Sequence, residues 1–325
     1  MSGTSTNRSC AVVGAGAAGL TAARRLQAAG LAVTLFDKGR QPGGRLASRR
    51  TAHGHFDHGL RYLEPQQIHA ESPPGVPLQP APVDAWQIAD LRHRVTPTPS
   101  REVFVGVPSN NEIARHWSTG LTLRQQRVES IKRSSGRWQV DLVDEASPQT
   151  FDAVVVTVPQ PQLQPLLPDL NLPADLDTIA YNPCWTLLWV PTSEMPLSLP
   201  SGYPMSHPSI DWLAREDSKP GRVGPARYVA HATAPWSLEM LEQPADTVAD
   251  MLKKDAADLL GISAGAHFAV SHRWRFAHVR QALGRPQRRL AAGLHYASDG
   301  CLGDGVEHAI ASGTAAANAL LRDED

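Results

Sequence analysis

The chain has 325 residues, of which 42% are hydrophobic, so it is long enough for two domains or one large α/β unit with a sizeable core. A formal net charge of −1 gives no general attraction to nucleic acid or to an anionic membrane, and no apolar run approaches the roughly 20 residues of a membrane span. The three cysteines form no C-x-x-C pair and the N-terminus lacks the apolar core of a signal peptide, so a soluble cytoplasmic protein without disulfides or zinc is expected.

The N-terminal segment is predicted to be a strand, a tight turn, a helix and a second strand. The strands are expected at 10–13 and 31–36, each an apolar run of strand length. A run rich in alanine and leucine, with a helical period, lies between them. Three glycines with the G-x-G-x-x-G spacing open that helix: Gly14, Gly16 and Gly19. This order is typical of a dinucleotide-binding unit, with the diphosphate at the N-terminus of the helix.

Each residue of this motif has a physical task. Gly14 permits the tight turn, Gly16 lets a diphosphate approach the backbone, and Gly19 lets the helix pack close to the strand. Asp37 follows Gly14 by 23 positions, near the roughly 20 expected for a carboxylate that binds a ribose hydroxyl. The adjacent residues expected to contact the dinucleotide are Ala17, Ala18 and Lys38.

A second glycine element indicates which dinucleotide is bound. Gly43, Gly44, Arg45 and Ser48 match a G-G-R-x-x-S element that FAD-binding proteins of the glutathione-reductase and amine-oxidase type carry at this place. In that resemblance Arg45 lies near the FAD pyrophosphate, and a guanidinium complements two phosphates. A solvated basic loop is the alternative, because several arginines are close together here. The predicted cofactor is FAD.

The segment 51–65 is interpreted as a loop and strand approaching the flavin, with Leu60 and Arg61 as cofactor contacts. Its polar residues could suggest a metal site: His53, His55, Asp57 and His58. Metal ligands must converge and have supporting partners, which mixed spacing in a loop does not indicate, so no metal is expected.

The next segments alternate loops with short elements. The stretch 65–99 is rich in proline and is interpreted as an insertion dominated by loops, with a strand through 84–88. Residues 108–120 are predicted to form a helix capped by Ser109 or Asn110.

Residues 121–159 are predicted to form three strands. The sequence at 134–136 marks a hairpin turn, and the apolar run at 151–159 is typical of a buried strand. Flavoproteins of this type place a β-meander here and return to the nucleotide sheet at a V-x-T-x-P element, which residues 155–159 fit. By that resemblance Val128 lies where the backbone contacts adenine, and plain core packing is the alternative.

Residues 161–270 have a mixed pattern, with strands at 185–190 and 228–231 and a helix at 244–260. They are expected to form a smaller domain that covers the flavin.

The C-terminal segment is predicted to return to the N-terminal sheet as a strand, a loop and a helix of small residues over about 305–321. In FAD proteins of this type the acid of that loop, here Asp299, binds the ribityl chain. The helix begins at Gly305 and Val306, and its N-terminus points at the N1–C2=O edge of the flavin, where it stabilises negative charge on the reduced ring. A helix that merely closes the domain is the alternative.

These elements predict an α/β fold with two parts. One is a Rossmann-type FAD-binding domain of the glutathione-reductase and p-hydroxybenzoate-hydroxylase kind, and the other is a smaller substrate domain with a mixed sheet. The FAD-binding domain is assigned to 1–65, 101–165 and 275–325, and the substrate domain to 66–100 and 166–274.

The pattern as a whole resembles the bacterial renalase-like branch of the flavin amine-oxidase superfamily, over nearly the entire chain. The glycine motifs are shared by many flavoproteins, whereas the segments 210–222 and 272–277 are narrower. Renalases are FAD oxidases that take hydride from aberrant isomers of dihydro-NAD(P) and pass the electrons to O2 as hydrogen peroxide. The resemblance implies the same for this chain. FAD is expected to be bound non-covalently, because the sequence around Cys301 does not match the superfamily's covalent segment.

By resemblance and position, the pocket candidates are Arg61, Tyr62, His272 and Trp274. Tyr62 and Trp274 could instead be core aromatics, and His272 a structural histidine. Gly300 stands where the family has a tryptophan, so a wider substrate site is expected. Arg61 stands where the family has a glutamine, which would put a cation near the ring or the substrate.

Two other functions remain open. An amine oxidase or a desaturase would use the same fold, and it should have an aromatic cage and often a lysine near the flavin. A flavin-binding scaffold or sensor without turnover is the alternative of another class.

Overall fold

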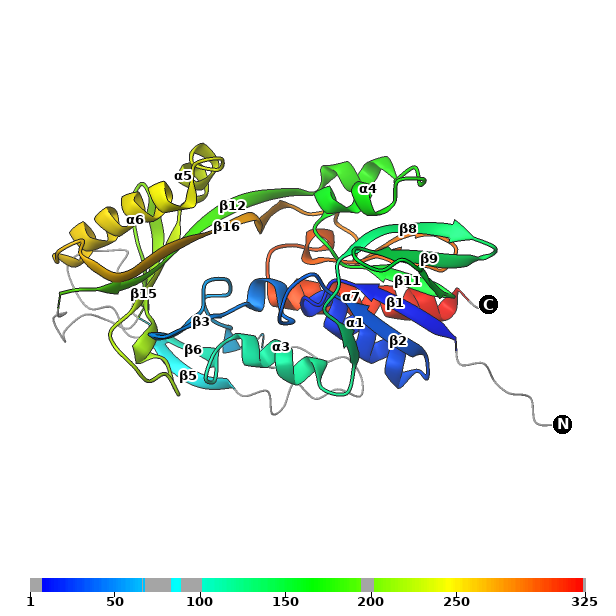
Figure 1. Ribbon diagram of the computed structural model, residues 1–325, viewed down its shortest axis with the longest axis horizontal. Helices are drawn as coiled ribbons and strands as arrows, with labels where there is room; N and C mark the ends of the chain where they lie inside the picture. The colour runs from blue at the N-terminus through cyan, green and yellow to red at the C-terminus, as the bar shows by residue number, and fades with distance from the viewer. Residues whose placement is uncertain (1–7, 66, 68–82, 89–100, 194–201, 324–325) are drawn as a thin grey trace.

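The computed structural model describes residues 8–65, 67, 83–88, 101–193 and 202–323, and it places two sheets at opposite ends of an elongated molecule (Figure 1). A six-stranded sheet has the order β17-β18-β11-β1-β2-β7 and contains segments from both ends of the chain. All its neighbouring strands are parallel except the pair β17–β18. Its strands are β1 (Ser9–Val13), β2 (Ala32–Phe36), β7 (Thr122–Arg124), β11 (Ala153–Val156), β17 (Arg288–Ala291) and β18 (Leu294–Tyr296). This sheet confirms the predicted Rossmann-type part.

The central strand β1 is apolar from Cys10 to Val13, because both of its faces are buried there. Cys10 and Val12 belong to one core cluster, whereas Ala11 and Val13 belong to the cluster on the other face. The first cluster contains the helices α1 (Ala17–Ala28) and α7 (Val306–Arg322), which lie side by side (Figure 1). They approach so closely that a Cβ at Gly313 would collide with the carbonyl of Ala18.

An antiparallel meander covers the other face of this sheet. It consists of β8 (Val128–Ser134), β9 (Arg137–Leu142) and β10 (Gln149–Phe151). The predicted meander is confirmed, but the prediction of three strands over 121–159 is wrong, since there are five. The apolar run splits between β10 and β11 at Asp152, whose carboxylate accepts hydrogen bonds from the Ser9 N–H at 2.8 Å and hydroxyl at 2.7 Å.

A five-stranded sheet with the order β13-β14-β15-β12-β16 forms the other part. Its strands are β12 (Ala180–Pro191), β13 (Gly202–Pro204), β14 (Ile210–Arg215), β15 (Tyr228–Ala232) and β16 (Ala266–Gln281). The helices α5 (Ala234–Glu239) and α6 (Ala245–Leu260) lie on one face, over Trp185, Leu187 and Trp189. The opposite face, with Leu188 and Val190, contacts Phe56 of the nucleotide-binding part. The long strands β12 and β16 connect the two parts (Figure 1).

Two small pairs of antiparallel strands lie between the sheets. The hairpin β3 (Arg49–Thr51) and β4 (Gly54–Phe56) follows the second glycine element, and β5 (Val83–Ile88) pairs with β6 (Arg101–Gly106). The second hairpin packs through Trp86 on Trp212 of β14. The predicted domain assignment puts β5 in the substrate domain and its partner β6 in the FAD-binding domain, and that assignment stays a prediction. The rest of the proline-rich stretch lies outside the described residues.

The helix predicted at 108–120 is α3 (Asn111–Ser118), and Asn110, one of the two predicted caps, precedes it. Asn110 occupies the N-cap position without a side-chain hydrogen bond to the helix. Its Oδ1 instead accepts from the Gly106 N–H, and its Nδ2 donates to the Leu60 carbonyl. The Asn111 N–H donates to the hydroxyl of Ser48, a residue of the second glycine element. A short helix α4 (Leu163–Leu166) follows β11, and no helix of the described residues is long and apolar enough to cross a membrane.

Candidate functional site

The three motif glycines fall into two groups when a Cβ is built on each. At Gly14, where φ is +106°, the Cβ would lie 2.6 Å from Thr157 Oγ1, and at Gly19 it would collide with the Gly14 carbonyl. These two glycines are therefore required by the packing of the protein itself. A Cβ on Gly16 would meet no atom within 4 Å. The space beside Gly16 is suited to a ligand rather than to the protein.

The second glycine element borders the same space. A Cβ on Gly44 would lie 3.4 Å from the Cα of Gly16, so the two glycine turns abut. Helix α1 begins at this point with no side-chain hydrogen bond at its N-cap, which is Gly16. Its first N–H groups and the positive end of its dipole are thus directed at the open space, as a diphosphate requires.

The predicted ribose-binding carboxylate is fixed at the end of β2. Asp37 Oδ2 accepts from the Ala15 N–H at 2.6 Å, and its Oδ1 accepts from the Gly39 N–H at 2.6 Å. Lys38 is exposed, and Val128 is buried in the same core cluster as Phe36, which precedes Asp37. This arrangement suits the adenosine end of a dinucleotide, although the individual contacts stay predictions.

Two predicted cofactor residues from opposite ends of the chain meet. Arg45 Nη1 lies 2.6 Å from Asp299 Oδ2 and donates to the Ala277 carbonyl at 3.0 Å. Asp299 precedes α7, whose N-cap is Gly305, with φ +130° and no side-chain cap. The termini of α1 and α7 and the Arg45–Asp299 pair are thus joined in one site, with Leu60 held to Arg45 by a backbone hydrogen bond of 2.7 Å.

Arg61 is held by three contacts. Its Nη2 lies 2.6 Å from Asp211 Oδ1, and its Nε donates to His231 Nδ1 at 3.2 Å. Its guanidinium also lies 5.6 Å from the centre of the Trp212 ring. The charge of Arg61 is therefore compensated by Asp211, and its expected place near the flavin ring or the substrate stays a prediction. The centre of the Tyr62 ring lies 5.4 Å from that of the same Trp212 ring, and the Tyr62 hydroxyl accepts a hydrogen bond from Arg101 Nη2 at 2.8 Å. These contacts are those of a structural aromatic residue.

His272 and Trp274 form a wall with His58, which sequence reasoning considered only as a metal ligand. The His272 ring lies 4.8 Å from His58 and 4.4 Å from Trp274, and Trp274 Nε1 donates to the His58 carbonyl at 2.8 Å. Burial, assisted by His272, lowers the pKa of His58 to about 4, and burial also lowers the pKa of His272. Both imidazoles are therefore neutral at pH 7.

His231 extends this neutral wall. Burial, together with the nearby cations Arg61 and His278, holds its pKa well below the ordinary value. Its Nδ1 accepts from Arg61, so its Nε2 carries the proton. That Nε2 and the Nδ1 of His58 are buried without a hydrogen-bond partner among the described residues. A buried polar atom without a partner calls for an explanation, and a hydrogen bond to a bound molecule is one that fits here.

His278 was not found by sequence reasoning. Its Nδ1 lies 2.9 Å from Asp304 Oδ2, and Asp304 Oδ1 accepts from the Val279 N–H at 3.0 Å. The hydrogen bonds to Asp304 and then to Cys184 raise the pKa of His278 to about 9, against the effect of burial. A signal existed in the sequence, because Asp304 directly precedes the predicted cofactor residue Gly305 and His278 follows the predicted pocket residue Trp274.

A buried ion cluster joins the two parts of the molecule beside this site. Asp57 contacts Lys219 at 3.0 Å and Arg222 at 2.7 Å, and Glu216 contacts the same two cations. All four side chains are at most 1% exposed. The carboxylate of Asp57 is thus fully engaged in ion pairs. No group of three side chains that could hold a metal ion occurs among the described residues.

The space next to Gly300 is filled. A Cβ there would collide with the Tyr181 hydroxyl and lie 2.8 Å from Ile179 Cγ2. Tyr181 and Ile179 therefore occupy the room that a larger residue at this position would need, and the expectation of a wider substrate site stays a prediction.

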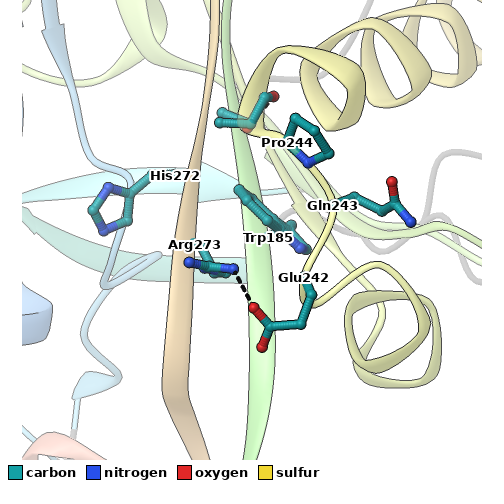
Figure 2. A pocket seen from close by; sticks show the side chains of 8 residues that line it. Trp185, Glu242, Gln243, Pro244, His272 and Arg273 are labelled. Carbon is teal, nitrogen blue, oxygen red and sulfur yellow. Dashed lines mark hydrogen bonds and ion pairs between the residues drawn. The ribbon is translucent and has the colours of Figure 1, made fainter.

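A surface pocket lies on the other side of the five-stranded sheet (Figure 2). His272 contributes to its lining but points away from Arg273 and Trp185 (Figure 2). Arg273 is engaged by Glu242 at 3.1 Å and lies 5.6 Å from the Trp185 ring. The other predicted pocket residues do not line it, so the pocket is separate from the site built above.

Comparisons with known proteins agree with this geometry. An NAD(P)-binding Rossmann-like domain model matches residues 12–72, and the flavin containing amine oxidoreductase model matches 111–321, which is more than half of the chain. A renalase from Mus musculus is 23% identical over 333 residues, which cover 93% of this chain and 94% of that protein.

Two solved structures share the fold. One is a suggested protoporphyrinogen oxidase from an Exiguobacterium species, with a TM-score of 0.73, 15% identity, and coverage of 98% of this chain and 100% of that one. The other is a putrescine oxidase variant with redesigned cofactor binding, with a TM-score of 0.72, 13% identity, and coverage of 97% and 99%. The open space at Gly16, between two glycine turns and an uncapped helix, is compatible with the flavin that the name of the matching family includes. The chain belongs to the flavin containing amine oxidoreductase family.

Proposed function

We propose that the chain is an FAD-dependent oxidase of the renalase-like type, which takes hydride from a dihydronicotinamide-type small molecule and passes the electrons to O2. The observation that carries the proposal is the neutral imidazole wall of His58, His231 and His272. The likeness to a renalase over 93% of the chain supports it.

Residues of the site would hold FAD without a covalent bond. Gly16 and Gly44 would accept the pyrophosphate, Asp37 the ribose, and Arg45 with Asp299 the diphosphate and ribityl region. Bound FAD supplies the hydride acceptor of the reaction. Cys301 is fully buried in a core cluster and burial raises the pKa of its thiol, which is unfavourable for a covalent attachment through sulfur.

The charge pattern favours a neutral ring over a protonated amine. An ammonium group would need an uncompensated carboxylate, but the described carboxylates of the site already have cationic partners. These pairs are Asp211 with Arg61, Asp299 with Arg45, and Asp304 with His278. The unpaired Nε2–H of His231 can instead donate to the carboxamide oxygen of a dihydronicotinamide substrate. Hydride can leave a dihydropyridine without a general base, so a wall of neutral imidazoles suffices.

The test begins with the cofactor. The purified protein is denatured with acid, and the released flavin is identified by chromatography; free FAD in about equimolar amount is expected, and retention of the flavin on the polypeptide would contradict non-covalent binding. Hydrogen peroxide release is then compared for 6-dihydro-NAD and putrescine. We expect release with the first alone. Release with putrescine alone would favour an amine oxidase, and release with neither would favour the scaffold or sensor.

A further inference from the structure

The His278–Asp304 pair lies where the C-terminal strand and helix converge. His278 is close to the end of β16, and Asp304 directly precedes Gly305, the N-cap of α7. The carboxylate is fixed twice, by the His278 imidazole at 2.9 Å and by the Val279 N–H at 3.0 Å. The imidazole is therefore held in a defined position at the N-terminal end of α7.

This position belongs to the site already described. The neighbouring Ala277 carbonyl accepts a hydrogen bond from Arg45, which pairs with Asp299. His278 also contributes to the lowered pKa of His231 on β15, so the two imidazoles are within electrostatic reach of each other. The side chain of His278 is 43% exposed, and a ligand at the start of α7 can therefore approach it.

A cation at this place does not serve the helix. The N-terminus of a helix carries partial positive charge, so a positive side chain beside it is unfavourable unless an anion is near. Asp304 provides one such anion and keeps the imidazole protonated. The imidazolium in turn offsets the charge of Asp304, so the positive potential of the helix terminus stays available to a second, transient anion.

We propose that His278, fixed by Asp304 at the N-terminal end of α7, stabilises the negative charge that a bound flavin gains on reduction and so raises its reduction potential. This inference rests on the proposed FAD cofactor. His278 is an electrostatic residue here, and Asp304 is a positioning residue that acts through it. Fixed charges of this kind are worth most where they need not reorganise during the reaction.

The test measures the reduction potential of the FAD-loaded protein by anaerobic equilibration with a reference dye at pH 7. His278→Gln removes the cation, and we expect the ratio of reduced to oxidised flavin at a given dye potential to fall about tenfold, a shift of about 30 mV for a two-electron couple. The matched control is His267→Gln, because His267 is exposed on the same strand. It should leave the potential unchanged.

The pH dependence separates this role from a structural one. The groups that face His278 are Asp304 on the loop before α7, Cys184 on β12, His231 on β15 and, beyond Asp304, Arg45. With a pKa of about 9, His278 carries its charge below that pH, so the difference between wild type and His278→Gln should vanish as the pH rises through about 9. The same comparison, with and without His278→Gln, can be made in proteins that carry Asp304→Asn. There the difference in reduction potential should vanish at a lower pH, nearer the ordinary histidine pKa of about 6.5.

The outcomes are distinguishable. A His278→Gln protein that holds FAD at the wild-type potential at pH 7 would overturn the inference while leaving FAD binding intact. A wild-type protein that binds no FAD would overturn the proposed function and this inference with it. A drop in potential common to His278→Gln and His267→Gln would also count against the specific role.

Discussion

Replacing Lys219 by methionine should destabilise the protein strongly. Its ammonium lies 3.0 Å from Asp57 Oδ2 and 2.5 Å from Glu216 Oε1, and its side chain is 1% exposed. Methionine retains much of the side-chain volume but leaves two buried carboxylates with Arg222 as their remaining cation. Breaking a buried pair in this way costs about 3–5 kcal/mol, because an uncompensated charge stays in the interior. We therefore expect the free energy of unfolding to fall by about 4 kcal/mol.

Urea unfolding at pH 7 measures this loss, with Lys253→Met as the matched control. Lys253 pairs with Asp250, which is 75% exposed, so the control should change stability by less than about 0.5 kcal/mol. Adding Asp57→Asn to Lys219→Met should recover part of the loss, since the orphaned charge is then removed. If Lys219→Met lowered the free energy of unfolding by less than about 1 kcal/mol, as little as the control, these four side chains would not form a buried, coupled network.

Three further predictions follow from the site. Gly16→Val should abolish retention of the flavin on purification. Its Cβ would meet no protein atom, so the thermal unfolding curve followed by circular dichroism should stay unchanged. The control Ala28→Val, on the exposed face of the same helix, should keep the flavin. The pKa of His58 is lowered to about 4 in the folded protein, so the unfolded chain binds the proton more readily. The free energy of unfolding, measured by urea titration, should therefore fall by about 3 kcal/mol between pH 6.5 and 4. This loss should be absent in His58→Gln. Gly300→Ala should lower the melting temperature, since the new methyl collides with the Tyr181 hydroxyl, and Tyr181→Phe should relieve part of that loss; an unchanged melting temperature in Gly300→Ala would contradict the packing seen here.

The parts of the fold that the sequence predicts well are those whose determinants are local. The strand, turn and helix around Gly14, Gly16 and Gly19 follow from spacing alone, and so does the helix α6. Resemblance supplies the return of Asp299 and α7 to the same sheet. The Arg45–Asp299 contact then brings together residues that local pattern could not relate.

The substrate side of the site could not be predicted in this way. The contact between Asp57 and Lys219 joins residues 162 positions apart, and no local periodicity specifies such a pair. The segment that contains Lys219 was noticed as characteristic, but its charges are equally compatible with an exposed loop. The packing at Gly300 could not be predicted for the same reason, because the side chain that fills the space comes from Tyr181 on β12.

The absorbance of the purified protein under anaerobic conditions, before and after addition of 6-dihydro-NAD, shows whether a bound flavin accepts hydride from a dihydronicotinamide. We expect a flavin spectrum that bleaches rapidly on addition and returns when air is admitted. A flavin spectrum that does not bleach would contradict the proposed substrate, and the absence of any flavin spectrum after incubation with FAD would contradict the assignment of the glycine turns as its binding site.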